Sequence, residues 1–102
     1  MLIHGGTPAR RSSLAQALRT APGLDLRVRV SSRAAEAAKC LADPAVVAVF
    51  LVDTPVDAEA VRTSARARGL SGQTYDLEPR DDVVMIVSLA RSASAATDGR
   101  SL

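Results

Sequence analysis

The first third of the chain places apolar residues at helical spacing and marks both ends of the helix. Thr7-Pro8 offers a capping hydroxyl followed by proline at the first helical position. Leu14 and Leu18 belong to an apolar series with three- and four-residue spacing, and Pro22-Gly23 ends it. The pattern predicts an amphipathic helix of about three turns.

Five other segments have the patterns of β-strands. Leu26–Val30 alternates apolar and basic residues, which predicts a half-buried strand at a sheet edge. Ala45–Val52 and Val83–Val87 are apolar without alternation, as strands buried on both faces of a parallel sheet are. Met1–His4 is a short apolar start, and Gln73–Leu77 is a weaker, mostly polar candidate.

Two further helices are expected between these strands. Ser31-Ser32 can cap a helix that carries Ala37 and Leu41 and ends at Asp43-Pro44. A third helix is predicted over residues 56–68, with Gly69 at its end.

Strands that alternate with helices predict right-handed βαβ units and a parallel sheet. We therefore expect a three-layer α/β domain of the flavodoxin-like type, truncated to four or five strands, with the first and third strands central and the second outside. The sequence leaves open whether Val83–Leu89 is the fourth or the fifth strand. The domain is expected to cover residues 1–89, and residues 90–102 to form a short helix or a flexible tail.

Composition limits the class of protein. A chain of 102 residues fits one domain, and 47% hydrophobic with 24% charged residues is close to the globular average. The apolar run Ala45–Val52 is too short to cross a bilayer, and Met1 is not followed by a secretory signal, so we expect a cytoplasmic protein without membrane contact. Phe50 and Tyr75 are the only aromatic residues against 19 alanines, so the core must rest on aliphatic side chains.

Charge is distributed unevenly along the chain. Residues 1–42 carry seven basic and two acidic groups, although the whole chain has a net charge of only +2. Arg10, Arg11, Arg27 and Arg29 are the candidates for a surface that contacts a protein partner or a second copy of the chain. We favour a solvated face over nucleic-acid binding, because no helix-turn-helix, zinc finger or aromatic stacking platform accompanies these arginines.

Ligands of open parallel sheets bind beyond the carboxyl ends of the strands. The expected sheet brings four stretches together there: His4-Gly5-Gly6-Thr7, Ser31-Ser32, Asp53-Thr54-Pro55 and Ser88. Gly5-Gly6 before a helix could admit an anion, but the segment lacks both the G-x-G-x-x-G and the Walker pattern, so a tight turn is the simpler interpretation.

Catalytic and metal sites find less support. His4, Asp53 and Ser88 supply the residue types of a nucleophilic triad, but Ser88 lacks the G-x-S-x-G elbow that would expose its oxygen. One cysteine and one histidine cannot form a closed metal site, and Cys40 lies on the apolar side of the second predicted helix, as a buried thiol would. We assign no catalytic residue and no metal ligand.

Residues 1–56 resemble the receiver domain of bacterial response regulators, especially receivers that precede helix-turn-helix output domains. The resemblance is carried by Thr7–Leu18, Pro22–Val28, Ser32–Ala37 and Val46–Pro55, and more loosely by Val83–Ala90. It implies a flavodoxin-like fold, a role in signal transduction and transcription regulation, Asp53 at the phosphoacceptor position and Ser88 as the switch hydroxyl.

The chain departs from that family where the chemistry is done. Gly5-Gly6 stands in place of the acidic pair that holds Mg²⁺, and the only lysine, Lys39, lies on the second predicted helix instead of following a fifth strand. The resemblance therefore implies a pseudo-receiver that binds protein, is independent of phosphorylation, and needs neither Mg²⁺ nor another cofactor.

Other interpretations stay open. Leu2–Gly5 followed by Pro8–Arg10 is similar to the opening of the cobalt and iron chelatases of tetrapyrrole biosynthesis, which implies metal or tetrapyrrole binding through His4. A small α/β enzyme using His4 and Asp53, an anion or nucleotide module at Gly5-Gly6, and a gene fragment without activity are the remaining alternatives.

Overall fold

A sheet of parallel strands forms the central layer of the protein. The computed structural model describes residues 1–21, 28–53, 55–78 and 83–100. The elements are β1 (Leu2–Gly5), α1 (Pro8–Thr20), β2 (Arg29–Ser31), α2 (Ala34–Leu41), β3 (Val49–Val52), α3 (Ala58–Ala67), a 3₁₀ turn η1 (Ser71–Gln73), β4 (Thr74–Leu77) and α4 (Val83–Arg100). The strands lie in the order β2-β1-β3-β4, so the first and third are central and the second lies at an edge, as expected.

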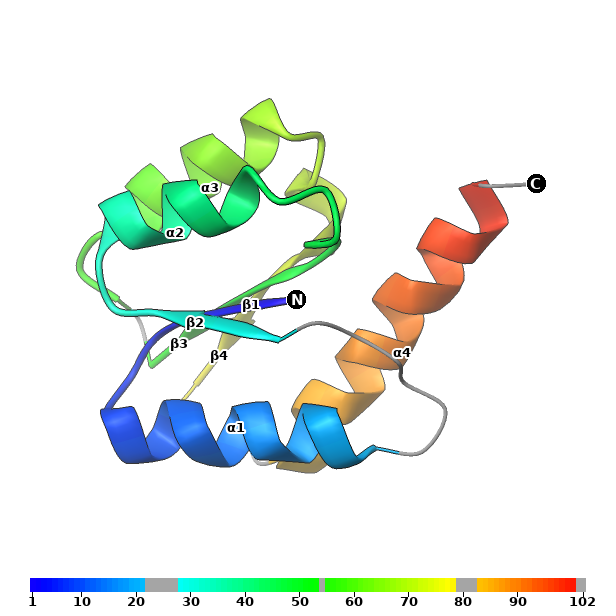
Figure 1. Cartoon of the computed structure of the whole chain (residues 1–102), viewed down its shortest axis with the longest axis horizontal. Coiled ribbons are helices and arrows are strands. Elements are labelled where there is room, and N and C mark those ends of the chain that lie inside the picture. The colour runs from blue at the N-terminus through cyan, green and yellow to red at the C-terminus, as the bar shows by residue number, and fades with distance from the viewer. Residues whose placement is uncertain (22–27, 54, 79–82, 101–102) are drawn as a thin grey trace.

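Helices cover both faces of the sheet (Figure 1). α2 and α3 pack side by side on one face, whereas α1 and α4 cover the other. Successive residues of a strand point to opposite faces, so neighbours on β1 and β3 enter different cores. Leu2 and Leu51 pack beneath α2 and α3, and Ile3 and Phe50 pack against α1 and α4. The result is a three-layer α/β domain with a truncated flavodoxin-like fold.

The central strands explain why their sequences show no alternation. All four residues of β1 and all four of β3 are buried. Phe50 is fully buried on the α1 side, and Tyr75 of β4 stacks on it with ring centroids 5.5 Å apart. The strand predicted at Gln73–Leu77 is observed as β4, Thr74–Leu77, while Gln73 belongs to η1. The side chains of β4 are mostly half-buried or exposed because the strand lies at the edge.

The prediction of a strand at Val83–Val87 is wrong. This segment begins α4, and Ile86, Ala90 and Ala93 are buried at helical spacing while Val84 is 70% exposed. A short apolar run has no period that separates a buried strand from a helix. α4 continues without a break across the expected boundary at residue 89.

Smaller differences concern β2 and the start of α2. Residues 26 and 27 of the predicted strand lie outside the described part of the chain, and Val30 is 47% exposed because its strand lies at an edge. The serines do not cap α2 with their hydroxyls. Glu36 instead accepts hydrogen bonds from the backbone N–H of Ser32 and of Arg33, and from the Ser32 hydroxyl.

Candidate functional site

The carboxyl ends of the strands carry a buried histidine with a partner on each ring nitrogen. His4 is the third residue of β1 and is fully buried. Its Nδ1 lies 2.7 Å from the Ser31 hydroxyl at the end of β2, and its Nε2 lies 2.7 Å from a carboxylate oxygen of Asp57. A carboxylate only accepts, so Nε2 carries a proton toward Asp57, and the Ser31 hydroxyl donates to Nδ1 when the ring is neutral. Three segments that are distant in sequence are thereby joined at one side chain.

Asp57 is well placed to remain ionised. It precedes the first residue of α3, yet its side chain makes no capping bond to that helix and turns to His4 instead. The hydrogen bond from His4 lowers the pKa of the Asp57 carboxyl, and a bond from the Ala34 N–H at the start of α2 acts in the same direction against desolvation. The N-termini of α2 and α3 also favour negative charge there.

Ser31, His4 and Asp57 are the residue types of a nucleophilic triad, but their burial favours a structural role. Ser31 is only 3% exposed, so a substrate carbonyl cannot reach its hydroxyl without a movement of the strand ends. A metal ion at His4 would have to displace Ser31 or Asp57. Metal or tetrapyrrole binding through His4 stays a prediction.

Gly5 and Gly6 form a turn that leaves no room for side chains. Both have positive φ, and a Cβ on Gly5 would lie 2.5 Å from the Pro55 ring and 2.7 Å from the Val52 carbonyl oxygen. The guanidinium of Arg11 donates to the carbonyl oxygens of Gly5 and Gly6 at 3.1 and 2.6 Å. The turn is therefore explained by the packing of Gly5 against Pro55 and by the hydrogen bonds from Arg11, without a ligand.

Asp53 lies directly after β3 and faces an arginine. Its φ of 57° is in the left-handed region, which aspartate tolerates better than most residues. Arg10 Nε lies 3.4 Å from Asp53 Oδ1, and the same guanidinium donates to the Glu78 carbonyl at 3.0 Å. The side chains of Arg10 and Asp53 are 21% and 23% exposed, so this ion pair is less screened than one on the open surface. The carboxylate therefore has a cationic partner from its own chain.

Only some of the predicted site residues lie close together in the structure. His4, Gly5, Gly6 and Asp53 lie at one edge of the sheet, and the Thr7 hydroxyl caps α1 by accepting from the Arg10 N–H at 3.1 Å. Ser88 does not end a strand but lies exposed on α4. Thr54 lies outside the described residues.

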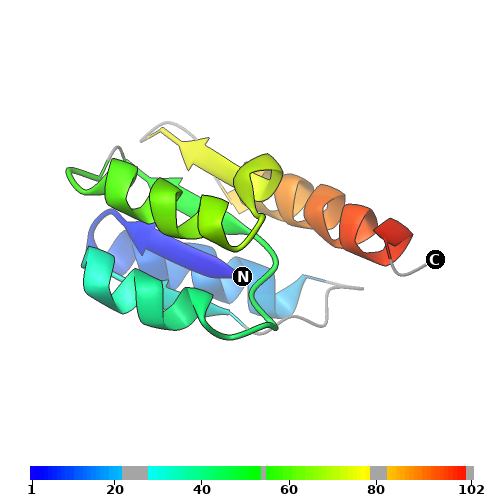
Figure 2. The same ribbon diagram turned by 90° about the horizontal axis from the view of Figure 1, so that it is seen from above.

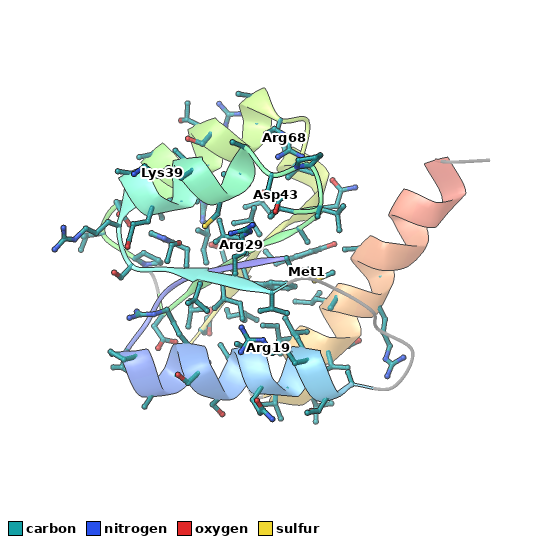
Figure 3. All side chains as sticks on the ribbon, viewed as in Figure 1. Met1, Arg19, Arg29, Lys39, Asp43 and Arg68 are labelled. Carbon is teal, nitrogen blue, oxygen red and sulfur yellow. The ribbon has the colours of Figure 1, made fainter. Side chains whose placement is uncertain are left out.

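The arginines predicted to contact a partner are largely bound within the chain. Arg10 and Arg11 bind the loops described above. Arg29 donates to the Asp43 carboxylate at 2.7 Å; both residues are labelled in Figure 3. Arg68, also labelled there, donates to main-chain carbonyls of the α2–β3 connection, including that of Asp43 at 3.2 Å. Arg27 lies outside the described residues.

Sequence reasoning missed Asp57 and the role of Arg10. Asp57 follows Asp53 by four residues and stands at the start of a predicted helix, where it suggests an ordinary cap. Only the tertiary structure brings its carboxylate to His4. Arg10 was one of several arginines on a predicted helix, and nothing in the pattern pointed to Asp53.

No protein-family model, curated protein or solved structure matches this chain. Within the described residues, no cluster of three or more histidine, cysteine, aspartate or glutamate side chains could hold a metal ion. Among the helices of the described residues, none is both long enough and apolar enough to span a membrane.

Proposed function

We propose that this chain is a receiver-like regulatory domain that binds protein and does not accept a phosphoryl group at Asp53. The flavodoxin-like order of strands and the position of Asp53 at the carboxyl end of β3 agree with the resemblance to receivers. Lone Cys40 has no second cysteine in the sequence for a disulfide, which fits a reducing, cytoplasmic setting.

The ion pair between Arg10 and Asp53 carries the proposal. Phosphoryl transfer to a carboxylate needs a divalent cation that neutralises the charge developing on the phosphoryl oxygens. At Asp53 a guanidinium already lies against the carboxylate. It would repel Mg²⁺, and it offers only donors where the metal needs oxygen ligands.

The glycine turn supports the same conclusion. A carboxylate at position 5 is what a Mg²⁺ site of this kind would need, but the ring of Pro55 occupies that space. A side chain at Gly6 would meet Val52 at 2.9 Å. With the switch chemistry absent, regulation would depend on which surface the domain presents to a partner.

The test is a two-dimensional amide NMR spectrum of the whole chain, titrated first with Mg²⁺ and then with beryllofluoride. Asp53→Asn is the matched control, since it keeps the shape of the side chain and removes its charge. We expect both proteins to give dispersed spectra whose amide shifts change with neither additive. Saturable shifts around Asp53 in the wild type that vanish in Asp53→Asn would overturn the proposal.

A further inference from the structure

Strand β4 leaves one row of its backbone groups without a neighbouring strand in the described part of the protein. β4 is the last strand of the order β2-β1-β3-β4, and Figure 2 shows it at the margin of the sheet. The Leu77 carbonyl accepts from the Asp53 N–H at 2.8 Å, so the peptide groups of Leu77 face β3. Alternation along a parallel strand then turns those of Tyr75 toward β3, and those of Thr74 and Asp76 outward.

A hollow of about 210 Å³ lies beside this edge, on the face covered by α3. It is lined by Arg62, Arg66, Ser71, Thr74 and Asp76. Arg62 forms an ion pair with Asp76, whereas Arg66 is exposed and the structure records no ion pair for it among the described residues. The hollow therefore holds a cationic group that is available to an acidic side chain from outside.

We propose that two copies of the chain pair through their β4 strands, antiparallel and about a two-fold axis at Tyr75. Two outward-facing residues of each copy then meet: Thr74 lies opposite Asp76 of the partner subunit, and Asp76 lies opposite Thr74 of the partner subunit. Each such pair exchanges both of its N–H···O bonds, as the hydrogen-bonded pairs of an antiparallel ladder do. Tyr75, whose peptide groups face β3, takes the non-bonded position between them.

The same register brings complementary charges together. Residues directly opposite in an antiparallel pair point to the same face of the sheet. Thr74 and Asp76 both line the hollow, so the partner's Asp76 would enter it beside Thr74. Arg62 contacts Asp76, and Arg66 lies one helical turn further along α3, toward Thr74. Arg66 would thus meet the partner's Asp76, and symmetry forms this ion pair twice.

The opposite edge of the sheet does not offer this fit. The Arg29 N–H donates to the Met1 carbonyl, so within β2 only Val30 turns its peptide groups outward. Arg29 already forms an ion pair with Asp43. Self-pairing of β2 would therefore form a single hydrogen-bonded pair and no new ion pair.

This pairing names the partner of the proposed binding domain and so rests on that function. The two ideas fail separately. Beryllofluoride shifts in a dimer would refute the proposed function and leave the pairing intact. A monomer whose spectrum does not respond to beryllofluoride would refute the pairing and leave the proposed function intact.

The first test is sedimentation equilibrium of the whole chain from micromolar to millimolar concentration, with Thr74→Pro and Thr74→Val. Both variants lose the hydroxyl that donates to the Leu70 carbonyl, but only proline removes the outward N–H. We expect the wild type and Thr74→Val to dimerise with similar affinity, and Thr74→Pro to dimerise roughly tenfold to a hundredfold more weakly. A monomeric wild type, or equal dimerisation of the two variants, would overturn the pairing.

The second test concerns the register. Arg66→Glu should weaken the dimer roughly tenfold because two carboxylates then meet. Adding Asp76→Arg should restore part of the loss, since it recreates the ion pair across the dimer but removes the one between Asp76 and Arg62. Circular dichroism establishes that each variant is folded. A dimer indifferent to Arg66→Glu would refute this register, and a monomer that instead binds an acidic peptide at β4 would assign the edge to another occupant.

Discussion

Replacing His4 by alanine tests whether the buried histidine holds the strand ends together. His4 is fully buried, so the substitution leaves a cavity, which costs about 2–4 kcal/mol for a side chain of this size. The Ser31 hydroxyl, 3% exposed, also loses its partner, which adds about 1–3 kcal/mol. Asp57 adds little because its side chain is 29% exposed and water can replace the ring. We expect a total loss of about 3–7 kcal/mol, out of roughly 5–15 kcal/mol for a domain of this size.

Urea unfolding followed by far-ultraviolet circular dichroism measures this loss. With a slope of about 1–2 kcal/mol per molar urea, the midpoint should fall by at least about 1.5 M. Ser31→Ala is the matched control, and a double-mutant cycle of the two substitutions should show a coupling of about 1 kcal/mol or more. A loss below about 1 kcal/mol in His4→Ala would mean that the histidine does not hold the strand ends, and would reopen a role for it in binding or catalysis.

Three further outcomes follow from contacts described above. Gly5→Ala should destabilise the protein by several kcal/mol because the new methyl group meets the ring of Pro55. Gly69 also has a positive φ but open space around it, so Gly69→Ala should cost only about 1 kcal/mol. Thermal unfolding of both variants measures the difference. The carboxyl of Asp57 has a lowered pKa when folded, so its stabilising effect is present above about pH 4 and is lost as the pH falls through the folded value; Asp57→Asn should flatten this acid limb of a stability–pH curve, and an unchanged limb would contradict the bond to His4. Arg68→Met should cost about 1–3 kcal/mol in urea unfolding, because the carbonyls that the guanidinium serves lose their donor; a neutral result would mean that water replaces it.

The strand order shows how far the pattern reaches. The predicted run Ala45–Val52 contains β3, whose residues Val49–Val52 lack alternation because they are covered on both faces, as those of a central strand are. The same reasoning failed at Val83–Val87, where a helix lays Ile86 and Ala90 against α1 and the sheet while exposing Val84. An apolar run records that some of its residues are buried. It does not record whether a sheet or a helix buries them.

The candidate site shows the same limit for polar residues. That His4, Gly5-Gly6 and Asp53 meet at one edge follows from their places after apolar runs, because parallel strands end together. Their partners do not follow from such places. Arg10 reaches Asp53, and Asp57 reaches His4, across loops whose paths no local pattern specifies.

The sequence by itself determined the α/β class, the central strands and the edge where the polar residues gather, because each depends on periodicity and on chain order. The tertiary structure alone decided that the last apolar segment is a helix, that Ser31 and Asp57 enclose His4, and that Arg10 lies against Asp53. It also decided that Thr74 and Asp76 turn their backbone groups outward beside Arg66. These features depend on distances between segments far apart in the chain, and on such distances a linear pattern of apolar and polar residues carries no information.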